Sequence, residues 1–256
     1  MAKSKFEYVK DFEQDDRLLL GCWIVVRLDG KGFTKFTALH NFEKPSDARG
    51  LGLMDAAAQA VMVDFPDIRI AFGESDEYSF ALHKDTQVYG RRASKLISLI
   101  TSSFTGNYIR LWPEFLPDIK LQSTPLFDGR AVCYPTEKAL RDYLSWRQAD
   151  THVNCQYNTC YWALVNSGKS PKEAQETLKG TQTDFKNELL YSTFGINYNK
   201  LPAQFRKGST IIRATTIVTE ERENGTTKEK TRMKPTILFI DIIRDQFWNQ
   251  HPSILK

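Results

Sequence analysis

Apolar and polar positions alternate in a way that predicts a strand and then a helix near the start of the chain. Residues 22–28 are a short apolar run rich in β-forming residues, and the run ends at Asp29 and Gly30. This pattern predicts a buried strand followed by a turn. Residues 50–65 place apolar side chains at helical spacing, and Pro66 closes the segment. We therefore expect a helix there.

The next segments continue the alternation of strands and helices. Two β-rich runs, 68–72 and 76–82, are separated by a short break that contains glycine, which predicts a hairpin. Residues 87–104 place apolar side chains on one side of an amphipathic helix, and 129–134 have the pattern of another short strand. The first half of the chain therefore begins with the order strand, helix, strand, strand.

The second half is mainly helical and then changes to β. Residues 136–165 and 171–190 are rich in helix-forming residues. From residue 209 a long β pattern begins, and Asn224-Gly225 is a typical hairpin turn. Because both flanks of this turn are very polar, we expect the tip of the hairpin to project into solvent.

These patterns predict an α+β fold with a palm-like antiparallel sheet and flanking helices. We expect residues 1–135 to form the catalytic core. Residues 136–256 would add a helical region and a long basic β-hairpin, packed on the core as one continuous unit.

Composition changes this picture only a little. The 256 residues carry a net charge of +4, which permits a nucleic-acid partner without requiring one. We find no apolar segment long enough to span a bilayer and no secretory signal at the N-terminus, so no membrane partner is expected. The four cysteines lack zinc-site spacing and fit reduced thiols in the cytoplasm.

The first group of residues that could take part in binding or catalysis is RLDGKGFTKF, residues 27–36. An aspartate at the end of a buried strand is well placed as an oxygen ligand for Mg²⁺. Backbone N–H groups of residues 30–33 would form a nest around a triphosphate, with Lys31 and Lys35 nearby. The same residues also fit a simple Asp-Gly turn with solvated lysines.

The second group is FGESDEYSF, residues 72–80. Its three acids would repel one another unless a cation lies among them, although a solvated hairpin tip is the alternative. If the two strands are neighbours in an antiparallel sheet, Asp29 and Asp76 would hold two Mg²⁺ ions at about 4 Å from each other. Such a pair of ions supports in-line attack on phosphorus, as in polymerase palms and nucleotidyl cyclases.

The third group is HVNCQYN, residues 152–158. On a helix, His152 and Gln156 would share one face, and Asn154 and Asn158 another. Taken alone, this pattern is also that of a generic polar helix face.

The three motifs RLDGKGFTKFT, FGESDEYSF and HVNCQYNTCYWAL, in this order and spacing, resemble the tRNA-histidine guanylyltransferases. The resemblance extends over essentially the whole chain. The third motif departs from the usual His-Ile-Asn-Asn-Leu-Tyr-Asn of the family, because Cys155 and Gln156 replace an asparagine and a leucine.

The resemblance implies roles for particular residues. Asp29, Asp76 and Glu77 would be the catalytic acids, and the metal ligands would be Asp29, Gly30 and Asp76. The nucleotide site would comprise Asp29, Gly30, Lys31, Gly32, Phe33, Thr34, Lys44, Asp47, Ser75 and Asp76. The tRNA or its activating nucleotide would be bound by Lys95, Arg130, His152, Asn154 and Asn158.

The resemblance also implies a reaction and partners. The enzyme would activate the 5′-monophosphate of tRNA-His with ATP, add GMP from GTP in the 3′-5′ direction and release pyrophosphate, using two Mg²⁺ ions. It would work as a homotetramer, a dimer of dimers, in the cytoplasm, with nuclear or mitochondrial pools also open.

Two other functions fit parts of the sequence. A nucleotidyl cyclase would share the two-metal palm but use one nucleotide and no RNA, and a non-catalytic RNA-binding module would use the acids only to shape a hairpin. For RNA binding, the candidate phosphate contacts are basic residues of 84–95 and 204–234. They are Lys84, Arg91, Arg92, Lys95, Arg206, Lys207, Arg213, Arg222, Lys228, Lys230, Arg232 and Lys234.

Overall fold

A six-stranded antiparallel sheet forms the centre of the computed structural model, which describes residues 4–221 and 227–256, with side chains described outside 216–230. The strand order is β4-β1-β3-β2-β5-β6. The strands are β1 (Trp23–Gly30), β2 (Ile68–Glu74), β3 (Glu77–Leu82), β4 (Phe127–Tyr134), β5 (Ser209–Glu221) and β6 (Thr227–Leu238). The predicted α+β class with an antiparallel sheet is confirmed.

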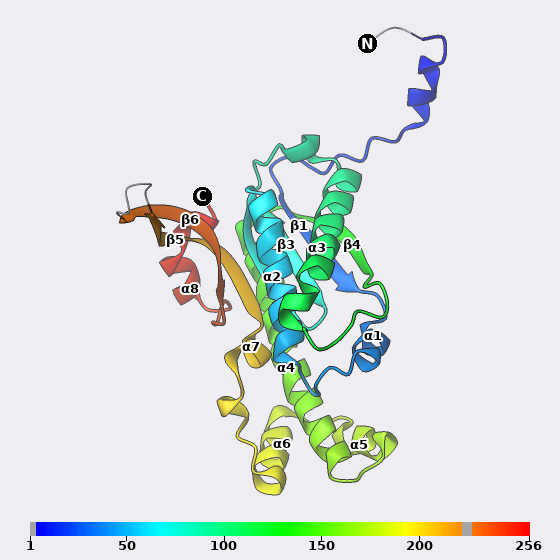
Figure 1. Ribbon diagram of the computed structural model, residues 1–256, viewed down its shortest axis with the longest axis vertical. Helices are drawn as coiled ribbons and strands as arrows, with labels where there is room; N and C mark the ends of the chain where they lie inside the picture. The colour runs from blue at the N-terminus through cyan, green and yellow to red at the C-terminus, as the bar shows by residue number, and fades with distance from the viewer. Residues whose placement is uncertain (1–3, 222–226) are drawn as a thin grey trace.

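The first four strands and two long helices form a βαββαβ unit (Figure 1). The short helix α1 (Phe33–Leu39) and α2 (Ala48–Asp64) connect β1 to β2, and α3 (Ala93–Phe115) connects β3 to β4. Each connection returns the chain to the same sheet, so the split βαβ topology follows. This is the palm-like arrangement that the sequence predicts.

Strand β1, second from one edge of the sheet, is buried on both faces. Ile24, Val26 and Leu28 belong to the core under α2 and α3, whereas Trp23 and Val25 belong to a second core on the opposite face. A strand covered on both sides needs apolar residues at consecutive positions, which explains the uninterrupted apolar run in this part of the sequence.

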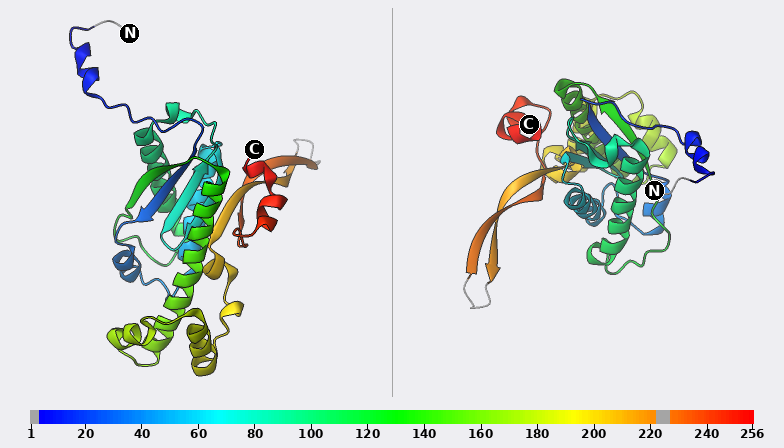
Figure 2. Two further views of the ribbon diagram at one scale, coloured as in Figure 1. Left: turned by 180° about the vertical axis from the view of Figure 1, so that it is seen from behind. Right: turned by 90° about the horizontal axis from the view of Figure 1, so that it is seen from above.

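The opposite face of the sheet is covered by α4 (Glu137–Asn166) and by α8 (Asp245–Gln250). The first half of α4 crosses the sheet, and its second half extends beyond the sheet into a small helical lobe (Figure 2). This lobe packs α4 against α5 (Pro171–Leu178) and α6 (Thr183–Glu188), followed by a π turn at Leu189–Thr193. One helix therefore connects the sheet to the lobe.

The hairpin of β5 and β6 begins as part of the sheet and then leaves it. Only residues 209–212 of β5 pair with β2, and the rest of β5 pairs with β6 alone. Figure 1 shows the two strands curving away from the body of the molecule. The predicted Asn224-Gly225 turn lies outside the described residues. Helix α7 (Ala203–Lys207) precedes the hairpin.

Short 3-10 segments complete the chain at Glu7–Phe12, Val88–Arg91, Tyr198–Lys200 and Pro252–Ile254. None of the helices in the described part of the chain is both long and apolar enough to cross a membrane.

The prediction of one amphipathic helix over 87–104 is wrong. Tyr89 and Gly90 adopt left-handed φ values of 51° and 61°, which break the helix, and α3 begins only at Ala93. The backbone N–H groups at the start of α3 donate to the carbonyl and the carboxylate of Asp16. A contact from the N-terminal segment therefore fixes the start of this helix, and the helical repeat does not reveal it.

Arg91 is a structural residue, so its prediction as an RNA phosphate contact is wrong. Its side chain is 1% exposed, and its guanidinium donates to five backbone carbonyls. They belong to Leu18, Leu19, Cys22, Lys84 and Thr86. These bonds fasten the segment before β1 to the loop after β3.

Arg213 also uses its guanidinium for hydrogen bonds to backbone carbonyls. It donates to the carbonyls of Met62, Phe65 and Ile68, which fixes β5 to the end of α2. This guanidinium is therefore a poor candidate for RNA contact.

We expect Arg91→Met to lower the free energy of unfolding by about 3–5 kcal/mol, because buried carbonyls lose their donors. Urea unfolding followed by circular dichroism measures the change. The matched control is Arg17→Met, since the side chain of Arg17 is 70% exposed and pairs with an exposed Asp15. Equal stability of the two variants would contradict the structural role of Arg91.

Candidate active site

Two aspartates meet at one edge of the sheet, where β1 ends and the β2–β3 hairpin turns. In the antiparallel pairing of β1 and β3, Asp29 lies opposite Glu77. The backbone N–H of Gly30 donates to the carbonyl of Asp76 over 3.0 Å. This hydrogen bond joins the end of β1 to the β2–β3 turn. The predicted convergence of Asp29 and Asp76 is therefore present in the fold.

The electrostatics of this edge favour a cation. Burial raises the pKa of Asp76, and the negative charges of Asp29 and Glu77 raise it further. Like charges held together in this way are stabilised by a bound positive ion. A divalent cation bound here would therefore relieve the repulsion between these carboxylates.

Asp29 and Asp76 fit a Mg²⁺ site in which the substrate supplies some of the ligands. Within the described residues, no three His, Cys, Asp or Glu side chains form a ready-made metal cage. Mg²⁺ is commonly held by one or two carboxylates together with water and substrate phosphates. Asp29, Asp76 and the carbonyl of Gly30 are therefore the residues that would hold such an ion.

Glu77 has partners other than a metal. Its Oε1 accepts a hydrogen bond from Arg147 Nη1 at 3.1 Å, and its Oε2 lies 3.8 Å from Arg27 Nε. Glu77 is 9% exposed, so these arginines supply most of its neutralisation. The pairing ties the edge of the sheet to α4, and a catalytic role for Glu77 stays a prediction.

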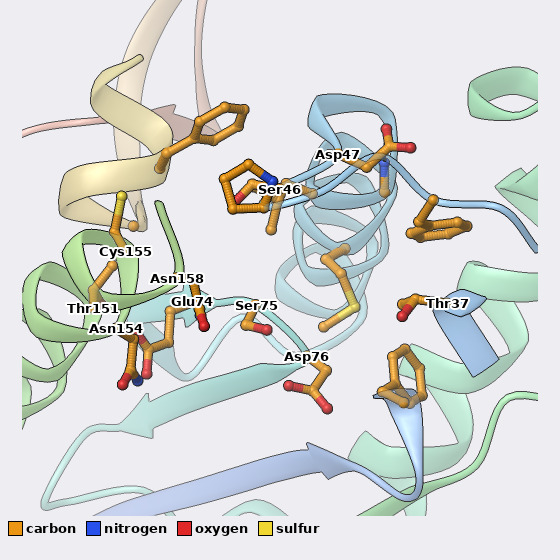
Figure 3. A pocket seen from close by; sticks show the side chains of 18 of the residues that line it. Thr37, Ser46, Asp47, Glu74, Ser75, Asp76, Thr151, Asn154, Cys155 and Asn158 are labelled. Atoms are coloured by element: carbon orange, nitrogen blue, oxygen red, sulfur yellow. Dashed lines mark hydrogen bonds between the residues drawn. The ribbon is translucent and has the colours of Figure 1, made fainter. Parts of the chain in front are cut away.

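A cavity of about 490 Å³ opens beside Asp76 (Figure 3). Its walls come from α1, the loop 42–47, α2, the β2–β3 turn, α4 and α7. This volume is typical of sites for small molecules and cofactors. In Figure 3 the carboxylate of Asp76 points into the cavity, with Ser75 and Glu74 beside it.

The loop 42–47 is shaped by Asp47. Its carboxylate accepts backbone N–H groups of Glu43, Arg49 and Gly50 and forms an ion pair with the Arg49 side chain at 2.7 Å. Asp47 thereby caps α2 and fixes the loop. On the same loop, Lys44 Nζ donates to Thr37 Oγ1 over 3.0 Å at the cavity wall.

Six of the predicted nucleotide-site residues line the cavity. They are Phe33, Thr34, Lys44, Asp47, Ser75 and Asp76. The others, Asp29, Gly30, Lys31 and Gly32, are not among the residues that line it.

The predicted nest of N–H groups over residues 30–33 is wrong for its first two members. Gly30 N–H donates to Asp76 and Lys31 N–H donates to the Leu126 carbonyl over 2.8 Å. Gly32 then adopts a left-handed φ of 69° and starts α1. The N–H groups of Gly30 and Lys31, which the glycine pattern suggested for a triphosphate, are therefore used in hydrogen bonds within the fold.

The HVNCQYN motif lies within α4, with its side chains on different faces. Asn154 and Asn158 line the cavity together with Cys155. His152 turns toward the chain after the small lobe, where the Tyr198 hydroxyl lies 2.9 Å from His152 Nδ1. Burial lowers the pKa of His152.

The residue that replaces the usual leucine in this motif has a structural partner. Gln156 is 2% exposed and donates to Asn187 Oδ1 over 2.8 Å and to the Thr183 carbonyl. An amide buried in this way needs those bonds, and α6 supplies them. The departure at this position therefore belongs to the packing of α4 against α6.

Lys95 and Arg130 lie away from the cavity. Lys95 stands in the first turn of α3 with its Nζ 5.9 Å from the Tyr89 ring centroid. Tyr108 of the same helix lines the cavity. Lys95 lies thirteen residues before Tyr108, and thirteen residues of helix span about 20 Å. Arg130 projects from β4, where it lies opposite Arg27 and 3.5 Å from Asp128.

Asp55, a buried carboxylate on the cavity wall, lies outside all three sequence motifs. It accepts hydrogen bonds from Tyr78 at 3.0 Å, from Gln204 at 2.9 Å and from Ser209 at 2.8 Å. Burial raises its pKa to about 6. An aspartate within an otherwise apolar helical repeat was the available signal.

Glu74 and Thr151 are two further cavity residues that the sequence analysis did not select. Burial raises the pKa of Glu74 to about 7, and Thr151 of α4 forms a hydrogen bond with it that acts in the opposite direction. In Figure 3 Glu74 lies close to Thr151 and Asn154 of α4, on one side of the cavity.

A palm-type antiparallel sheet, with two aspartates at its edge beside a cavity of nucleotide size, defines an enzyme of the nucleotidyl-transfer class. Two family models match the chain. The model for tRNAHis guanylyltransferase matches residues 6–135, and the model for the Thg1 C terminal domain matches residues 138–244. The chain belongs to the tRNAHis guanylyltransferase family.

Individual relatives agree with this assignment. A "Probable tRNA(His) guanylyltransferase" of Dictyostelium discoideum is 54% identical over 256 residues, which are 100% of this chain and 99% of that protein. The "tRNA(His) guanylyltransferase" of Neurospora crassa is 50% identical over 283 residues, covering 100% of this chain and 97% of that protein.

Solved structures have the same fold. The tRNA(His) guanylyltransferase of Saccharomyces cerevisiae superposes with a TM-score of 0.78 at 46% identity, covering 81% of this chain and 93% of that chain. A bacterial tRNA(His) guanylyltransferase-like protein in complex with ATP superposes with a TM-score of 0.72 at 20% identity, covering 99% and 100%.

The raised pKa of Asp55 makes stability depend on pH. The folded protein holds this proton up to about pH 6, whereas the unfolded chain releases it near the ordinary value of 3.8. Stability contributed by the neutral carboxyl is therefore present below pH 3.8 and is lost as the pH rises through 6. We therefore expect the free energy of unfolding of Asp55→Asn, measured relative to that of wild type, to increase by about 2–3 kcal/mol from pH 4 to pH 7.

Urea unfolding of both proteins across this range provides the comparison. Asp64→Asn, on the same helix, is the matched substitution for normalising the two profiles, because Asp64 accepts only an exposed hydrogen bond from Ser103. A wild-type to Asp55→Asn difference that does not change with pH would refute the assignment.

Proposed function

We propose that this protein adds a guanine nucleotide to the 5′ end of tRNA-His by two-metal catalysis at the edge formed by Asp29 and Asp76. The observation that carries the proposal is the placement of these two aspartates at neighbouring strand ends, held by the Gly30 to Asp76 hydrogen bond of 3.0 Å beside the cavity. Membership of the family supplies the reaction class.

The chemistry requires an activation step before the transfer. A tRNA 5′-monophosphate is a poor electrophile because it has no good leaving group. Transfer of AMP from ATP to that phosphate forms a pyrophosphate linkage and releases pyrophosphate. The 3′-hydroxyl of GTP then attacks the activated 5′-phosphorus and AMP departs, after which pyrophosphate is removed from the added nucleotide.

A pair of Mg²⁺ ions would supply activation of the attacking oxygen and neutralisation of the leaving group. The protein's part is to hold oxygen ligands in place: Asp29 and Asp76 through carboxylates, and Gly30 through its carbonyl. In this role the two aspartates are metal ligands and carry no proton. The partial burial of Asp76 strengthens the electrostatic interactions made there.

The cavity would bind the nucleotide triphosphate. Lys44 supplies positive charge on its wall, and Ser75, with a left-handed φ of 50°, turns the chain so that Asp76 points inward. Structures of the bacterial guanylyltransferase-like protein in complex with ATP and with GTP support a nucleotide on this fold.

We also propose that the protein acts as a homotetramer, a dimer of dimers, in the cytoplasm, with nuclear or mitochondrial pools as further places of action. Its four cysteines are free, which suits a reducing compartment. Phosphates of the tRNA would meet basic side chains on α7 and the hairpin. Arg206 and Lys207 end α7 beside the cavity residues Gln204 and Phe205, and Lys234 is exposed on β6.

The test is an incorporation assay with purified protein, 5′-monophosphorylated tRNA-His, ATP, labelled GTP and Mg²⁺. We expect label at the 5′ end of the tRNA that depends on ATP. Conversion of GTP alone into a cyclic product would instead support a cyclase, and tight tRNA binding with neither reaction would support a binding module.

We expect Asp29→Ala and Asp76→Ala each to lower incorporation by about 10³-fold or more, because several kcal/mol of charge stabilisation in the transition state is lost. Single-turnover assays at saturating tRNA, ATP and GTP measure the effect. Asp142→Ala is the matched control, since Asp142 pairs with Lys138 on the exposed side of α4. Circular dichroism should give folded spectra for all three variants. Near-normal activity of either active-site variant would contradict the metal assignment.

A further inference from the structure

The edge formed by Asp29 and Asp76 borders the face of the sheet that carries α4. Asp76 points into the cavity (Figure 3). Asp29 projects to the same face as its cross-strand partner Glu77, whose carboxylate contacts Arg147 of α4. Residues opposite each other in an antiparallel pair project to the same side. A second reactant can therefore approach Asp29 from the face that carries α4.

Part of that face is uncovered. Figure 2, seen from behind, shows no helix of the described chain drawn over β4 on this face. The accessibility of β4 agrees, because Val132 is 39% exposed and Arg130 is exposed. We call this area, bounded by Arg27, Arg130, Val132 and Trp146, the open face.

Guanidinium groups are concentrated on the open face. Arg27 and Arg130 are cross-strand partners on β1 and β4. Arg147 of α4 shares with Arg27 the single carboxylate of Glu77, and Asp150 lies 3.6 Å from Arg147. Arg130 is 3.5 Å from Asp128, with both side chains more than half exposed. Exposed pairs of this kind are weak and exchange readily for a phosphate.

Trp146 is the aromatic side chain at the border of the open face, and it is 57% exposed. The guanidinium carbon of Arg147 lies 3.5 Å from the centroid of its ring. The ring also meets Tyr143 edge-on at 6.3 Å, and Tyr143 is itself fixed by a 2.6 Å hydrogen bond to Ser79 of β3. A single exposed aromatic is common, but this indole is clamped on one side and leaves its other side accessible.

We propose that Trp146 is a stacking platform for the 5′-terminal base of the RNA substrate, whose 5′-phosphate lies toward Arg130 and Arg27. Stacking of a base on an aromatic ring, with guanidinium groups for the backbone phosphates, is a common way in which proteins bind nucleic acids. The chain of contacts from Trp146 through Arg147 to Glu77, opposite Asp29, places the platform next to the reacting edge. This inference rests on the proposed function.

The same geometry favours RNA over a free nucleotide on this face. The cavity beside Asp76 has aromatic rings of its own, because Tyr157 and Tyr161 line it and are stacked with an interplanar angle of 10°. A mononucleotide fits an enclosed cavity. A polymer needs an open surface from which the rest of the molecule extends into solvent.

The test compares Trp146→Ala and Trp146→Phe with wild type in steady-state incorporation, with the tRNA, ATP and GTP concentrations varied separately. We expect Trp146→Ala to raise the KM for 5′-monophosphorylated tRNA-His about tenfold, through loss of stacking. The KM values for ATP and GTP should not change, and Trp146→Phe should restore most of the tRNA affinity because it keeps an aromatic face. Val63→Ala is the control, since it shortens an exposed apolar side chain on the opposite layer.

A direct readout uses tRNA with 2-aminopurine as its first base. Stacking on the indole should quench this fluorophore on wild type and release it on Trp146→Ala. An unchanged KM for tRNA, a raised KM for ATP in its place, or a change in oligomeric state by light scattering would each overturn the proposal. Failure of wild type to incorporate any label would overturn the proposed function itself, so the two failures are distinguishable.

Discussion

The antiparallel pairing of β1 with β3 is the constraint on which the site depends. It sets Asp29 opposite Glu77 and brings the Gly30 N–H to the Asp76 carbonyl at 3.0 Å. A shift of one residue in this register would turn Asp29 to the other side of the sheet. The apolar residues of β1, buried on both faces, prevent such a shift, because each would then meet the wrong core. The stability of the core thus fixes the geometry of the carboxylates.

Buried charges then connect this edge to the rest of the molecule. Glu77 reaches Arg147 on α4, and Asp55 on α2 holds Tyr78 of β3 together with Gln204 and Ser209 around α7. Each of these polar groups is satisfied by partners far away in the sequence, so each one fixes the relative position of two elements. The cavity lies between these elements, and its walls are thereby held in place around Asp76. A palm-type sheet needs such support because catalysis requires ligands that do not rearrange during the reaction.

Much of the fold and the central pair of aspartates could be predicted from local pattern. The apolar run before Asp29, the helical repeat of 50–65 and the glycine break after 68–72 each correspond to an observed element. What could not be predicted depends on contacts between distant segments. The break at Tyr89 and Gly90, the burial of Arg91 among five carbonyls, and the use of the Lys31 N–H by Leu126 are of this kind. The division of the chain after residue 135 stays a prediction, although β5 and β6 extend the same sheet as β1.

If Asp29 and Asp76 act as proposed, the RNA 5′-phosphate is activated before a nucleotide is added, and this order of steps can be measured. The protein is incubated with ATP, Mg²⁺ and tRNA-His that carries a labelled 5′-monophosphate, with GTP withheld. We predict that the label becomes resistant to phosphatase as an adenylylated 5′ end, and that GTP added afterwards moves it into an internal phosphodiester. A label that stays sensitive to phosphatase without GTP, combined with GTP addition that needs no ATP, would contradict the account.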